Sequence, residues 1–323
     1  MYKSKRLVKN LVRLVLPLVL VLVLAVIGSS IWLVHETSHV KAAPYLMKPE
    51  KYGQLSSRAA QITEETWPNS DGSTARGWLL RGMPGAPGIV LFHKYGADRS
   101  YLLNLGVKLS EASNFTVLMP DLRGHGENPP VKSTSFGGSE AADAASAIQY
   151  LKGLKTPDQQ QPLINGDIGL YGVELGALAA ISAAANDLNV KTLVLDDVPQ
   201  DSDAVLASAI GKRFPFASSV TSQVASLGTG LYFYDGSYKS GTPCDAAKTL
   251  VKRKVLLLAG TDAGDFQSST TKLSKCFPAG STIDAKFDLS PSGYSIMNAS
   301  IEQAEGYDQR VIDFFKQSFQ LEP

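Results

Sequence analysis

One short segment carries the side chains of a metal site. Residues His35-Glu36-Thr37-Ser38-His39 match H-E-x-x-H, in which two histidines one helical turn apart bind zinc and the glutamate acts as a general base. The segment directly follows a long apolar run, and no third ligand is evident in the sequence. Polar residues at the end of an apolar helix are the simpler interpretation. We therefore expect no metal and no cofactor, and zinc-dependent activity through His35 and His39 stands as a third functional hypothesis.

A second candidate for chemistry is Glu174, in the middle of Gly172-Val173-Glu174-Leu175-Gly176. A carboxylate can act as a nucleophile or as a general base when the protein positions it. Glycine two positions to either side allows a strand and a helix to approach closely at a tight turn. The surrounding sequence fits such a turn, because an apolar run precedes Glu174 and an alanine-rich helical stretch follows it.

These residues must be positioned by an alternating α/β arrangement. From residue 60 onward, short apolar runs alternate with amphipathic helical stretches, which predicts βαβ units and a mostly parallel sheet. The run 88–92 contains no polar residue, as is typical of a strand covered on both faces. The expected strands are 77–80, 88–92, 115–119, 168–171, 190–195, 255–259 and 283–287, the last at an edge, and the expected helices are 101–109, 141–151, 175–185 and 311–319.

Two further motifs come before the Glu174 segment, each directly after an expected strand. The first is His93-Lys94-Tyr95-Gly96, and the second contains Asp121, Arg123, Gly124, His125 and Gly126. In this order, the three motifs resemble the oxyanion loop, the D-x-R-G-H-G turn and the nucleophile elbow of the α/β-hydrolase superfamily, particularly its lipase, esterase and serine-aminopeptidase-like members. The resemblance covers roughly residues 60–320. It implies the α/β-hydrolase fold, with a mostly parallel central sheet flanked by helices.

The resemblance also assigns roles to the loop residues. His93, Lys94, Tyr95 and Leu175 are the expected oxyanion-loop residues, while His93 and His125 are expected to be hydrogen-bonded turn histidines. Lys94 replaces the glycine that usually follows the histidine, which adds a side chain where backbone normally approaches substrate. We expect its ammonium to pair with Glu174, and a solvated lysine is the alternative.

The catalytic residues that the resemblance implies are mostly replaced. Glu174 stands at the position of the nucleophilic serine, so no hydroxyl is present there. The related haloalkane dehalogenases and epoxide hydrolases carry a carboxylate at this position, normally Asp. Tyr294 stands where the catalytic histidine is expected, and no histidine follows His125. A phenol with a pKa of about 10 is a poor substitute for that base.

Several carboxylates follow two neighbouring expected strands. The resemblance implies a triad acid about three residues beyond Gly260, where Ala263 stands, so Asp262 and Asp265 are the two candidates. Asp196 and Asp197 follow the preceding strand at the same edge of the sheet. For each of the four carboxylates, a surface or capping role is the simpler interpretation.

The N-terminal region predicts a membrane anchor. Residues 14–34 form a run of 21 residues without a charge, long enough to span a hydrocarbon core of roughly 30 Å as a helix. Residues 1–13 hold five basic side chains and no acidic one, which are Lys3, Lys5, Arg6, Lys9 and Arg13. The positive-inside rule then places the N-terminus in the cytoplasm. We expect a polar linker over 35–58 and an extracytoplasmic domain over 59–320. A cleaved signal peptide and a buried core helix are the alternatives.

Cys244 and Cys276 are the only cysteines of the chain, and they flank the expected strand 255–259. An extracytoplasmic domain permits a disulfide between them. One cysteine begins its helix and the other ends its own, which leaves open whether the two are close enough to bond. Neither lies at the Glu174 turn, so cysteine–histidine catalysis is not expected.

Charge and the missing residues narrow the possible functions. Since five of the 31 basic residues lie in the tail, 26 basic and 30 acidic side chains remain beyond residue 13. A mildly acidic body without a basic cluster gives little reason to expect nucleic-acid binding. The leading hypothesis is a non-catalytic, membrane-anchored domain that binds an unknown small molecule or protein partner. The second is an atypical hydrolase of an ester, epoxide or peptide-like substrate that uses Glu174.

Overall fold

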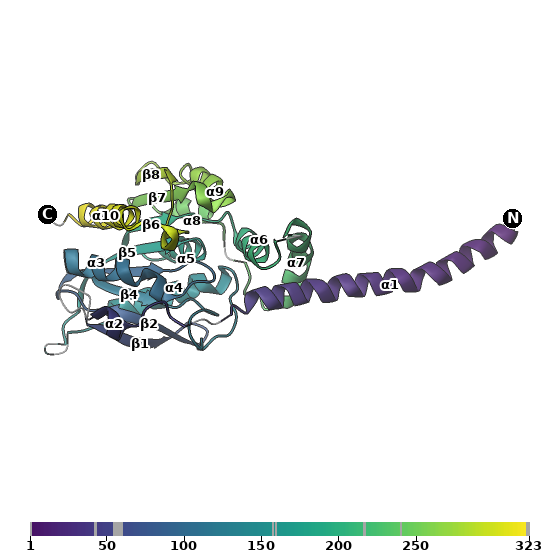
Figure 1. Cartoon of the computed structure of the whole chain (residues 1–323), viewed down its shortest axis with the longest axis horizontal. Coiled ribbons are helices and arrows are strands. Elements are labelled where there is room, and N and C mark those ends of the chain that lie inside the picture. The colour runs from purple at the N-terminus through teal and green to yellow at the C-terminus, as the bar shows by residue number, and fades with distance from the viewer. Residues whose placement is uncertain are drawn as a thin grey trace.

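The chain folds around a twisted, mostly parallel sheet (Figure 1), and most of the candidate residues follow the carboxyl ends of its strands. The computed structural model describes residues 2–41, 44–53, 61–156, 158, 160–215, 218–239 and 241–320, with the backbone alone for residues 2–10 and 12. Its eight strands follow the order β1-β2-β4-β3-β5-β6-β7-β8. Strand β2 is antiparallel to β1 and β4, and the remaining pairs are parallel. The predicted fold class is therefore confirmed.

The strands fall close to the predicted runs. Central strands consist almost entirely of apolar residues because helices cover both faces of the sheet. β8 lies at the edge, as its alternating sequence predicted. The bounds are β1 Ile62–Pro68, β2 Thr74–Leu80, β3 Ala86–Phe92, β4 Thr116–Pro120, β5 Ile164–Val173, β6 Val190–Asp196, β7 Lys254–Gly260 and β8 Thr282–Leu289.

Two hydrophobic cores lie on opposite faces of the sheet. On one face, α3 (Leu103–Ser113) and α10 (Ile301–Ser318) pack against the strands. On the other face lie α4 (Gly138–Gly153), α5 (Leu175–Ala184), α8 (Pro243–Thr249) and α9 (Asp265–Leu273). The second core continues into α6 (Ser202–Arg213) and α7 (Ser218–Tyr232), two helices inserted between β6 and β7 that we call the cap. Shorter helices are α2 Pro49–Gly53, η1 Arg99–Leu102, η3 Thr261–Ala263 and η4 Ile296–Asn298.

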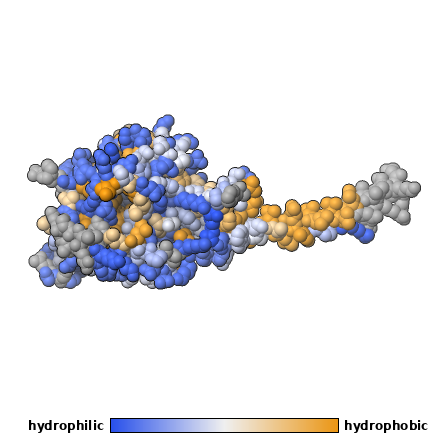
Figure 2. Space-filling model, in the orientation of Figure 1, coloured by the Kyte–Doolittle hydropathy of each residue, from blue (hydrophilic) through white to orange (hydrophobic). Residues whose placement is uncertain are grey.

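The N-terminal helix α1 (Tyr2–Ser38) projects from the domain, and its apolar side chains are largely exposed (Figures 1 and 2). From Arg13 to Ser38 it is long and apolar enough to cross a membrane. The helix continues four residues beyond the predicted boundary at residue 34. Its last turns are buried against the cap, because Val34 and Ser38 are fully covered.

The segment that follows α1 is not a free linker, which corrects the prediction for residues 35–58. Tyr45 donates a hydrogen bond from its hydroxyl to Asp121 at 2.9 Å, and the Leu46 N–H donates to Ser100 at 3.0 Å. These contacts bind the segment to the domain. Within the predicted linker, residues 42, 43 and 54–58 lie outside the described residues, as do residues 59 and 60 at the predicted start of the domain.

The two cysteines are bonded. Cys244 lies in α8, and Cys276 follows α9, with 5.3 Å between their Cα atoms. The two helices lie on the same face of the sheet and flank β7, so the cysteines come together although each lies near a helix end. The disulfide joins the two segments on either side of β7.

Candidate active site

Glu174 lies at a strained turn between β5 and α5. Its backbone has φ 51° and ψ −113°, a region that non-glycine residues rarely adopt. A Cβ at Gly172 would overlap the backbone of Gly176, and a Cβ at Gly176 would overlap the carbonyl oxygen of Phe92. Both glycines are therefore required by close backbone contacts, as the sequence predicted. The turn has the geometry of a nucleophile elbow.

The side chain of Glu174 turns back onto the oxyanion loop. Its Oε2 accepts a hydrogen bond from the backbone N–H of Tyr95 at 2.7 Å, and the nearby N–H of Leu175 also lowers the pKa of the carboxyl. The residue is fully buried, and its Oε1 has no hydrogen-bond partner among the described residues. Tyr95 and Leu175 are two of the four residues that the sequence predicted for the oxyanion loop, with His93 and Lys94. The carboxylate thus lies against the loop that follows β3.

Burial and nearby charges act on this carboxylate in opposite directions. Burial raises the pKa of Glu174, while the ammonium of Lys212, the N–H of Tyr95 and the ammonium of Lys94 lower it. Lys212 lies in the cap helix α6, and sequence reasoning missed it. No sequence signal identified it, because the position of the cap over the sheet cannot be read from residue patterns.

The predicted direct ion pair between Lys94 and Glu174 is wrong. The ammonium of Lys94 donates a hydrogen bond to the carbonyl oxygen of Tyr294 and lies 4.6 Å from the centre of the Tyr294 ring. The solvated alternative is also wrong, because the side chain is half-buried. Burial lowers the pKa of Lys94 to about 8, with Lys212 as the second cause. Lys94 acts on Glu174 through space.

Tyr294 lies between β8 and η4, in the stretch where the resemblance to the superfamily implies the catalytic histidine. Its hydroxyl lies 3.3 Å from the Ser208 hydroxyl of α6, and the Lys212 ammonium lies 4.5 Å from the ring centre. The ring thus contacts the ammonium groups of both Lys94 and Lys212, and its hydroxyl contacts the cap helix α6.

The two candidate acids have different surroundings. Asp262, in η3, accepts the backbone N–H of Ser292 at 3.1 Å, so it contacts the turn that carries Tyr294. Asp265 begins α9 and lines a surface groove of about 440 Å³ between α6, α7 and α9. Of the two candidates, Asp262 therefore contacts the turn that carries Tyr294, while Asp265 faces the groove.

Asp196 and Asp197 form a buried carboxylate pair at the end of β6, which corrects the expectation of surface roles. Asp196 accepts hydrogen bonds from the Gly293 N–H at 2.7 Å and the Tyr307 hydroxyl at 2.5 Å. Asp197 accepts the hydroxyl of Ser292 and the N–H of Gly260. Burial raises the pKa of both carboxyls, and the charge of Asp196 raises the pKa of Asp197 further. The pair fixes the turn that precedes Tyr294.

Neither buried histidine is available as a base. The Nε2 of His93 accepts the Leu122 N–H at 3.0 Å, and its Nδ1 donates to the Lys94 carbonyl at 2.8 Å. His125 donates from Nδ1 to the Arg123 carbonyl at 2.8 Å. Burial lowers the pKa of both rings, that of His125 to about 4. Both are neutral turn histidines near neutral pH.

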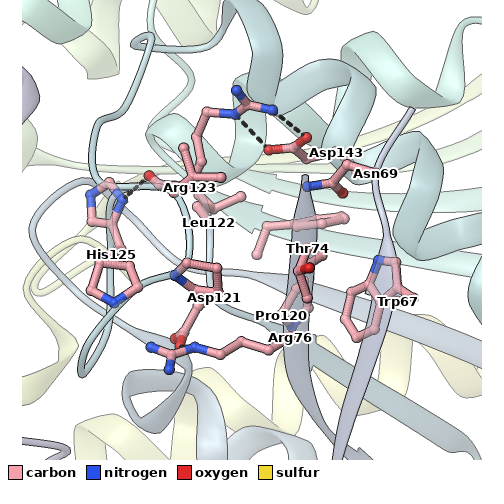
Figure 3. Close-up of a pocket in the computed structure, with 16 residues that line it drawn as sticks. Trp67, Asn69, Thr74, Arg76, Pro120, Asp121, Leu122, Arg123, His125 and Asp143 are labelled. Carbon is pink, nitrogen blue, oxygen red and sulfur yellow. Dashed lines mark hydrogen bonds and ion pairs between the residues drawn. The ribbon is translucent and has the colours of Figure 1, made fainter. Parts of the chain in front are cut away.

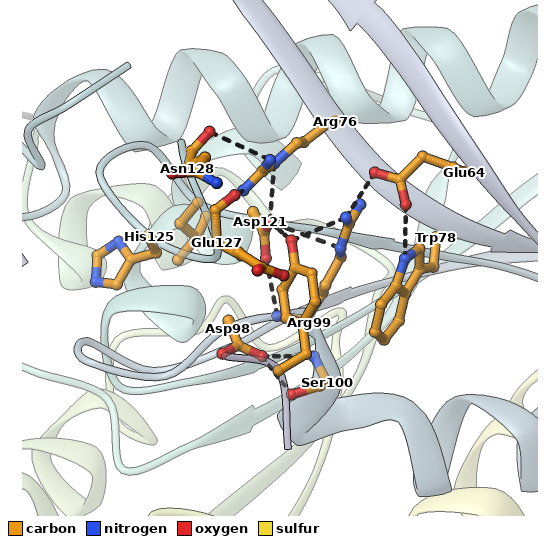
Figure 4. Close-up of polar contacts among 12 residues, drawn as sticks. Glu64, Arg76, Trp78, Asp98, Arg99, Ser100, Asp121, His125, Glu127 and Asn128 are labelled. Atoms are coloured by element: carbon orange, nitrogen blue, oxygen red, sulfur yellow. Dashed lines mark hydrogen bonds and ion pairs between the residues drawn. The ribbon is translucent and has the colours of Figure 1, made fainter. Parts of the chain in front are cut away.

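The turn that contains Asp121 is held by a network of charges (Figure 4). Asp121 accepts the Arg99 backbone N–H at 3.0 Å and the Nε of Arg76 at 3.1 Å. The buried guanidinium of Arg99 lies over the rings of both Tyr45 and Trp78, at 4.9 and 4.7 Å from their centres. These contacts connect β2, η1 and the segment after α1, and they give the turn a structural role.

Arg123 and the two glycines of the same turn are structural as well. Arg123 binds both carboxylate oxygens of Asp143 at 2.7 and 2.6 Å, beside a cavity of about 20 Å³ (Figure 3). That volume suits roughly one water molecule, so it is no substrate pocket. Gly124 and Gly126 have φ of 76° and 80°, and a Cβ at Gly126 would overlap the Asp121 carboxylate.

The H-E-x-x-H segment forms the last turns of α1 and packs on the cap. Glu36 is paired with Arg213, and Nδ1 of His35 lies 3.0 Å from the Tyr232 hydroxyl. Nδ1 of His39 lies 2.9 Å from the His35 carbonyl. Within the part of the chain that the structure describes, no group of three or more His, Cys, Asp or Glu side chains is arranged to hold a metal ion.

The end of α1 also reaches the oxyanion loop. The hydroxyl of Tyr95 donates to the carbonyl oxygen of Thr37 at 2.7 Å, while the N–H of the same residue holds Glu174. The Thr134 N–H donates to the Ser38 carbonyl at 3.0 Å. Two hydrogen bonds through Tyr95 therefore connect α1 to the buried carboxylate.

Comparison with solved structures identifies the fold. An esterase from Pyrococcus furiosus aligns over 87% of this chain and 97% of its own, with a TM-score of 0.61 and 17% identity. An α/β hydrolase from a Penicillium species aligns over 80% and 99%, with a TM-score of 0.57 and 15% identity. An enol-lactonase from Burkholderia xenovorans aligns over 78% and 100%, with a TM-score of 0.50 and 19% identity. The chain has the α/β-hydrolase fold.

Sequence comparison reaches only part of the chain. No protein-family model matches it. A 31.7 kDa uncharacterized protein of Escherichia coli is 27% identical over 136 residues, which cover 42% of this chain and 46% of that protein. A thiohydrolase of Aspergillus aculeatus is 27% identical over 126 residues, 38% of this chain and 37% of that protein. The chain spans less than half the length of these curated relatives.

Proposed function

We propose that this chain is a non-catalytic α/β-hydrolase-fold domain, held at a membrane by α1, that binds a ligand or partner without turning it over. The observation that carries the proposal is the position of the Glu174 carboxylate on the N–H groups of Tyr95 and Leu175. In a hydrolase of this fold, such donors stabilise the charge that develops in the transition state. Here they are already occupied by a side chain of the chain itself.

Two further absences at the site support the proposal. Position 174 carries no hydroxyl, so a serine nucleophile is missing. All four histidines of the chain are accounted for elsewhere, two in α1 and two in turns where they are hydrogen-bonded and neutral. Because a serine hydrolase needs a base that accepts a proton near neutral pH, the site lacks two of its three working parts.

The membrane anchor is supported by the length and composition of α1. Its apolar stretch is exposed over most of its length, which is unfavourable in water but favourable in lipid. The basic residues on its N-terminal flank favour a cytoplasmic N-terminus. The Cys244–Cys276 disulfide agrees with an oxidising compartment for the domain.

Hydrolysis assays on the full-length protein test the proposal. We suggest p-nitrophenyl esters, an epoxide, and a thioester, the last because a thiohydrolase is among the relatives. Wild type is expected to give no turnover above a blank. Glu174→Gln is expected to give the same result, and it is the matched variant because its amide keeps the size of the side chain. Turnover by wild type that Glu174→Gln abolishes would make Glu174 a working nucleophile or base and would overturn the proposal.

One observation favours the second candidate function, hydrolysis through Glu174. The Oε1 atom is buried without a partner among the described residues, while Oε2 is held by backbone donors. An attack of Oε1 on an epoxide carbon would form an ester bond and break the C–O bond of the ring, and the epoxide oxygen would take a proton from the Lys94 ammonium, whose pKa is lowered to about 8. The neutral amine of Lys94 would then accept a proton from water as the water oxygen attacks the ester carbonyl, which releases the diol and restores the Glu174 carboxylate. The epoxide assay tests this route by the gain in mass of the trapped ester.

A further inference from the structure

We propose that the cap helix α7 lies in the outer boundary of the same bilayer that α1 crosses, with an exposed apolar stripe among the lipid acyl chains. The inference rests on the proposed membrane anchoring and extends it from one helix to the cap. The partner of this surface is therefore the lipid bilayer itself.

The stripe consists of Val220, Leu227, Leu231 and Tyr234. These side chains are 61, 67, 57 and 88% exposed, although their types favour burial. Val220, Leu227 and Leu231 are seven and four residues apart, which places them on one side of α7, and Tyr234 follows two residues after the end of the helix. The buried residues of α7 are Ala225, Gly228 and Thr229, none of which belongs to the stripe. An exposed apolar stripe of this kind marks an interaction surface.

The segment around the stripe has no charge to desolvate. From residue 214 to residue 234 the sequence contains no Asp, Glu, Lys, Arg or His. Charged side chains are costly in the hydrocarbon region, so their absence over 21 consecutive residues suits contact with lipid. Arg213 precedes this stretch and Asp235 follows it, which places the charges at its two ends.

Contact with α1 fixes the depth of the stripe. Gly228 of α7 meets Ser30 of α1 so closely that a Cβ at Gly228 would lie 2.7 Å from the Ser30 carbonyl carbon. Small residues allow helices to approach in this way inside membranes. Ser30 lies four residues before Val34, the end of the uncharged run, which is about 6 Å along the helix. If the run spans the bilayer, α7 therefore lies beside its outermost turns.

The apolar surface is continuous between the two helices. Figure 1 shows α7 beside the domain end of α1, and Figure 2 shows hydrophobic surface passing from α1 onto the adjoining part of the cap. Trp32 of α1 is 52% exposed and packs on Phe214 at 5.8 Å between ring centres. Trp and Tyr are enriched at membrane boundaries, and Trp32 and Tyr234 supply one on each side of the contact. This continuity favours the bilayer over a second protein as the partner.

Lipid quenching of a fluorescent label tests the inference on the full-length protein. Single cysteines replace Leu227 or Leu231 and are labelled with an environment-sensitive fluorophore, while Cys244 and Cys276 are bonded to each other. The proteins are placed one per nanodisc in phosphatidylcholine and phosphatidylglycerol, with and without lipids that carry a doxyl quencher near the top of the acyl chain. Leu188→Cys is the matched control. Leu188 is 79% exposed, but it lies before the amino end of β6, whereas the cap follows the carboxyl end of that strand.

We expect labels at residues 227 and 231 to be quenched severalfold more strongly than the label at residue 188. A label at Val21 of α1 reports the anchoring separately. Strong quenching at residue 21 with quenching at 227 and 231 no greater than at 188 would overturn the inference and leave the anchor intact. Absence of quenching at residue 21 would overturn the anchor and the inference together. A second copy cannot cover the stripe in a disc that holds one chain, so a dimer surface would also leave residues 227 and 231 unquenched.

Discussion

At residue 174, the backbone and the side chain have different consequences. A non-glycine residue with φ of 51° costs of order 1–3 kcal/mol, so the surrounding fold must impose this turn. The flanking glycines allowed the sequence to predict the turn. They did not predict where the carboxylate points, because that depends on the separate loop that carries Tyr95. The side chain offsets part of the cost by accepting the backbone N–H of Tyr95.

The first prediction concerns repair of the site in two steps. Wild type should not react with a fluorophosphonate probe at position 174. Glu174→Ser empties the oxyanion loop and supplies a hydroxyl, but no imidazole lies near it, so labelling should be slow. Adding Tyr294→His supplies a base and should raise the labelling rate by roughly 10²-fold or more, a usual contribution of a general base. The rates are measured by intact-mass spectrometry of the full-length proteins.

The control for this repair is Glu174→Ala with Tyr294→His, which has the base but no nucleophile and should not be labelled. Synergy between the two changes is the informative quantity, because triad members act as a unit. A folded double variant that reacts no faster than Glu174→Ser would show that a histidine at residue 294 cannot reach the turn. The backbone of the 292–294 turn then becomes the reason, since Asp196 and Asp197 hold it in place.

The second prediction concerns the pH dependence set by Asp197. Burial and the charge of Asp196 raise the pKa of Asp197 in the folded protein above its value in the unfolded chain. A proton bound only in the folded state contributes stability that is full below the unfolded pKa and declines as the pH rises above it. The decline is at most about 1.4 kcal/mol per pH unit for one proton. Asp197→Asn should remove it, so wild type should lose more stability than the variant between about pH 5 and pH 8.

Chemical unfolding at several pH values measures this difference. Asn suits the position, because Asp197 has φ of 51° and Asn tolerates the left-handed region. Parallel stability curves for wild type and Asp197→Asn would mean that Asp197 is ionised in the folded protein throughout this range. The buried histidines are common to both proteins and Asp197 is not among the groups that shift their pKa, so their contributions cancel in the comparison.

At the scale of elements, apolar runs predicted the sheet but not the cap. Each expected strand is present within a few residues, because a strand covered on both faces is almost wholly apolar. β1 was not predicted, since its sequence is mostly polar and it lies at the exposed edge. Helices α6 and α7 were not predicted either, because serine, alanine and glycine give them a weak apolar pattern. Lys212 and Ser208 lie on α6 and contact Tyr294. Because α6 was not predicted, these two residues were missed in the sequence.

The third prediction tests the close packing of the elbow. Gly176→Ala places a methyl group against the carbonyl oxygen of Phe92, which is backbone and cannot move aside cheaply. The free energy of unfolding should fall by about 1–3 kcal/mol or more. Gly153→Ala is the matched control, because nothing lies within 4 Å of a Cβ there. Equal stabilities of the two variants would contradict the strand-to-helix contact described here.

At the scale of the whole molecule, α1 is part of the domain as well as a candidate anchor. Its last turns contact α7, pair Glu36 with Arg213 and accept a hydrogen bond from Tyr95. The sequence predicted the helix from its apolar run, but it assigned these last turns to a linker, because polar residues at a helix end carry no signal of what they contact. Removal of α1 would therefore expose the cap and loosen the oxyanion loop.

The fourth prediction concerns the topology of the molecule. The charge difference across α1 predicts that residues beyond it are extracytoplasmic. A reporter enzyme fused to the C-terminal end, of a kind that is active only outside the cytoplasm, should be active. Alkylation of the isolated protein without reductant should leave Cys244 and Cys276 unmodified. Activity of a cytoplasm-specific reporter together with alkylated cysteines would reverse the orientation.

The most direct test of the central claim, that the Glu174 carboxylate fills the oxyanion loop, is replacement of the side chain by a free molecule. Glu174→Gly suits the positive φ and leaves a space the size of propionate beside the N–H groups of Tyr95 and Leu175. We predict that propionate raises the unfolding temperature of Glu174→Gly, while wild type and Glu174→Gln do not respond and neutral propionamide has a weaker effect. Equal responses of wild type and Glu174→Gly to propionate would contradict the account, because they would mean that the donors are free in the native protein.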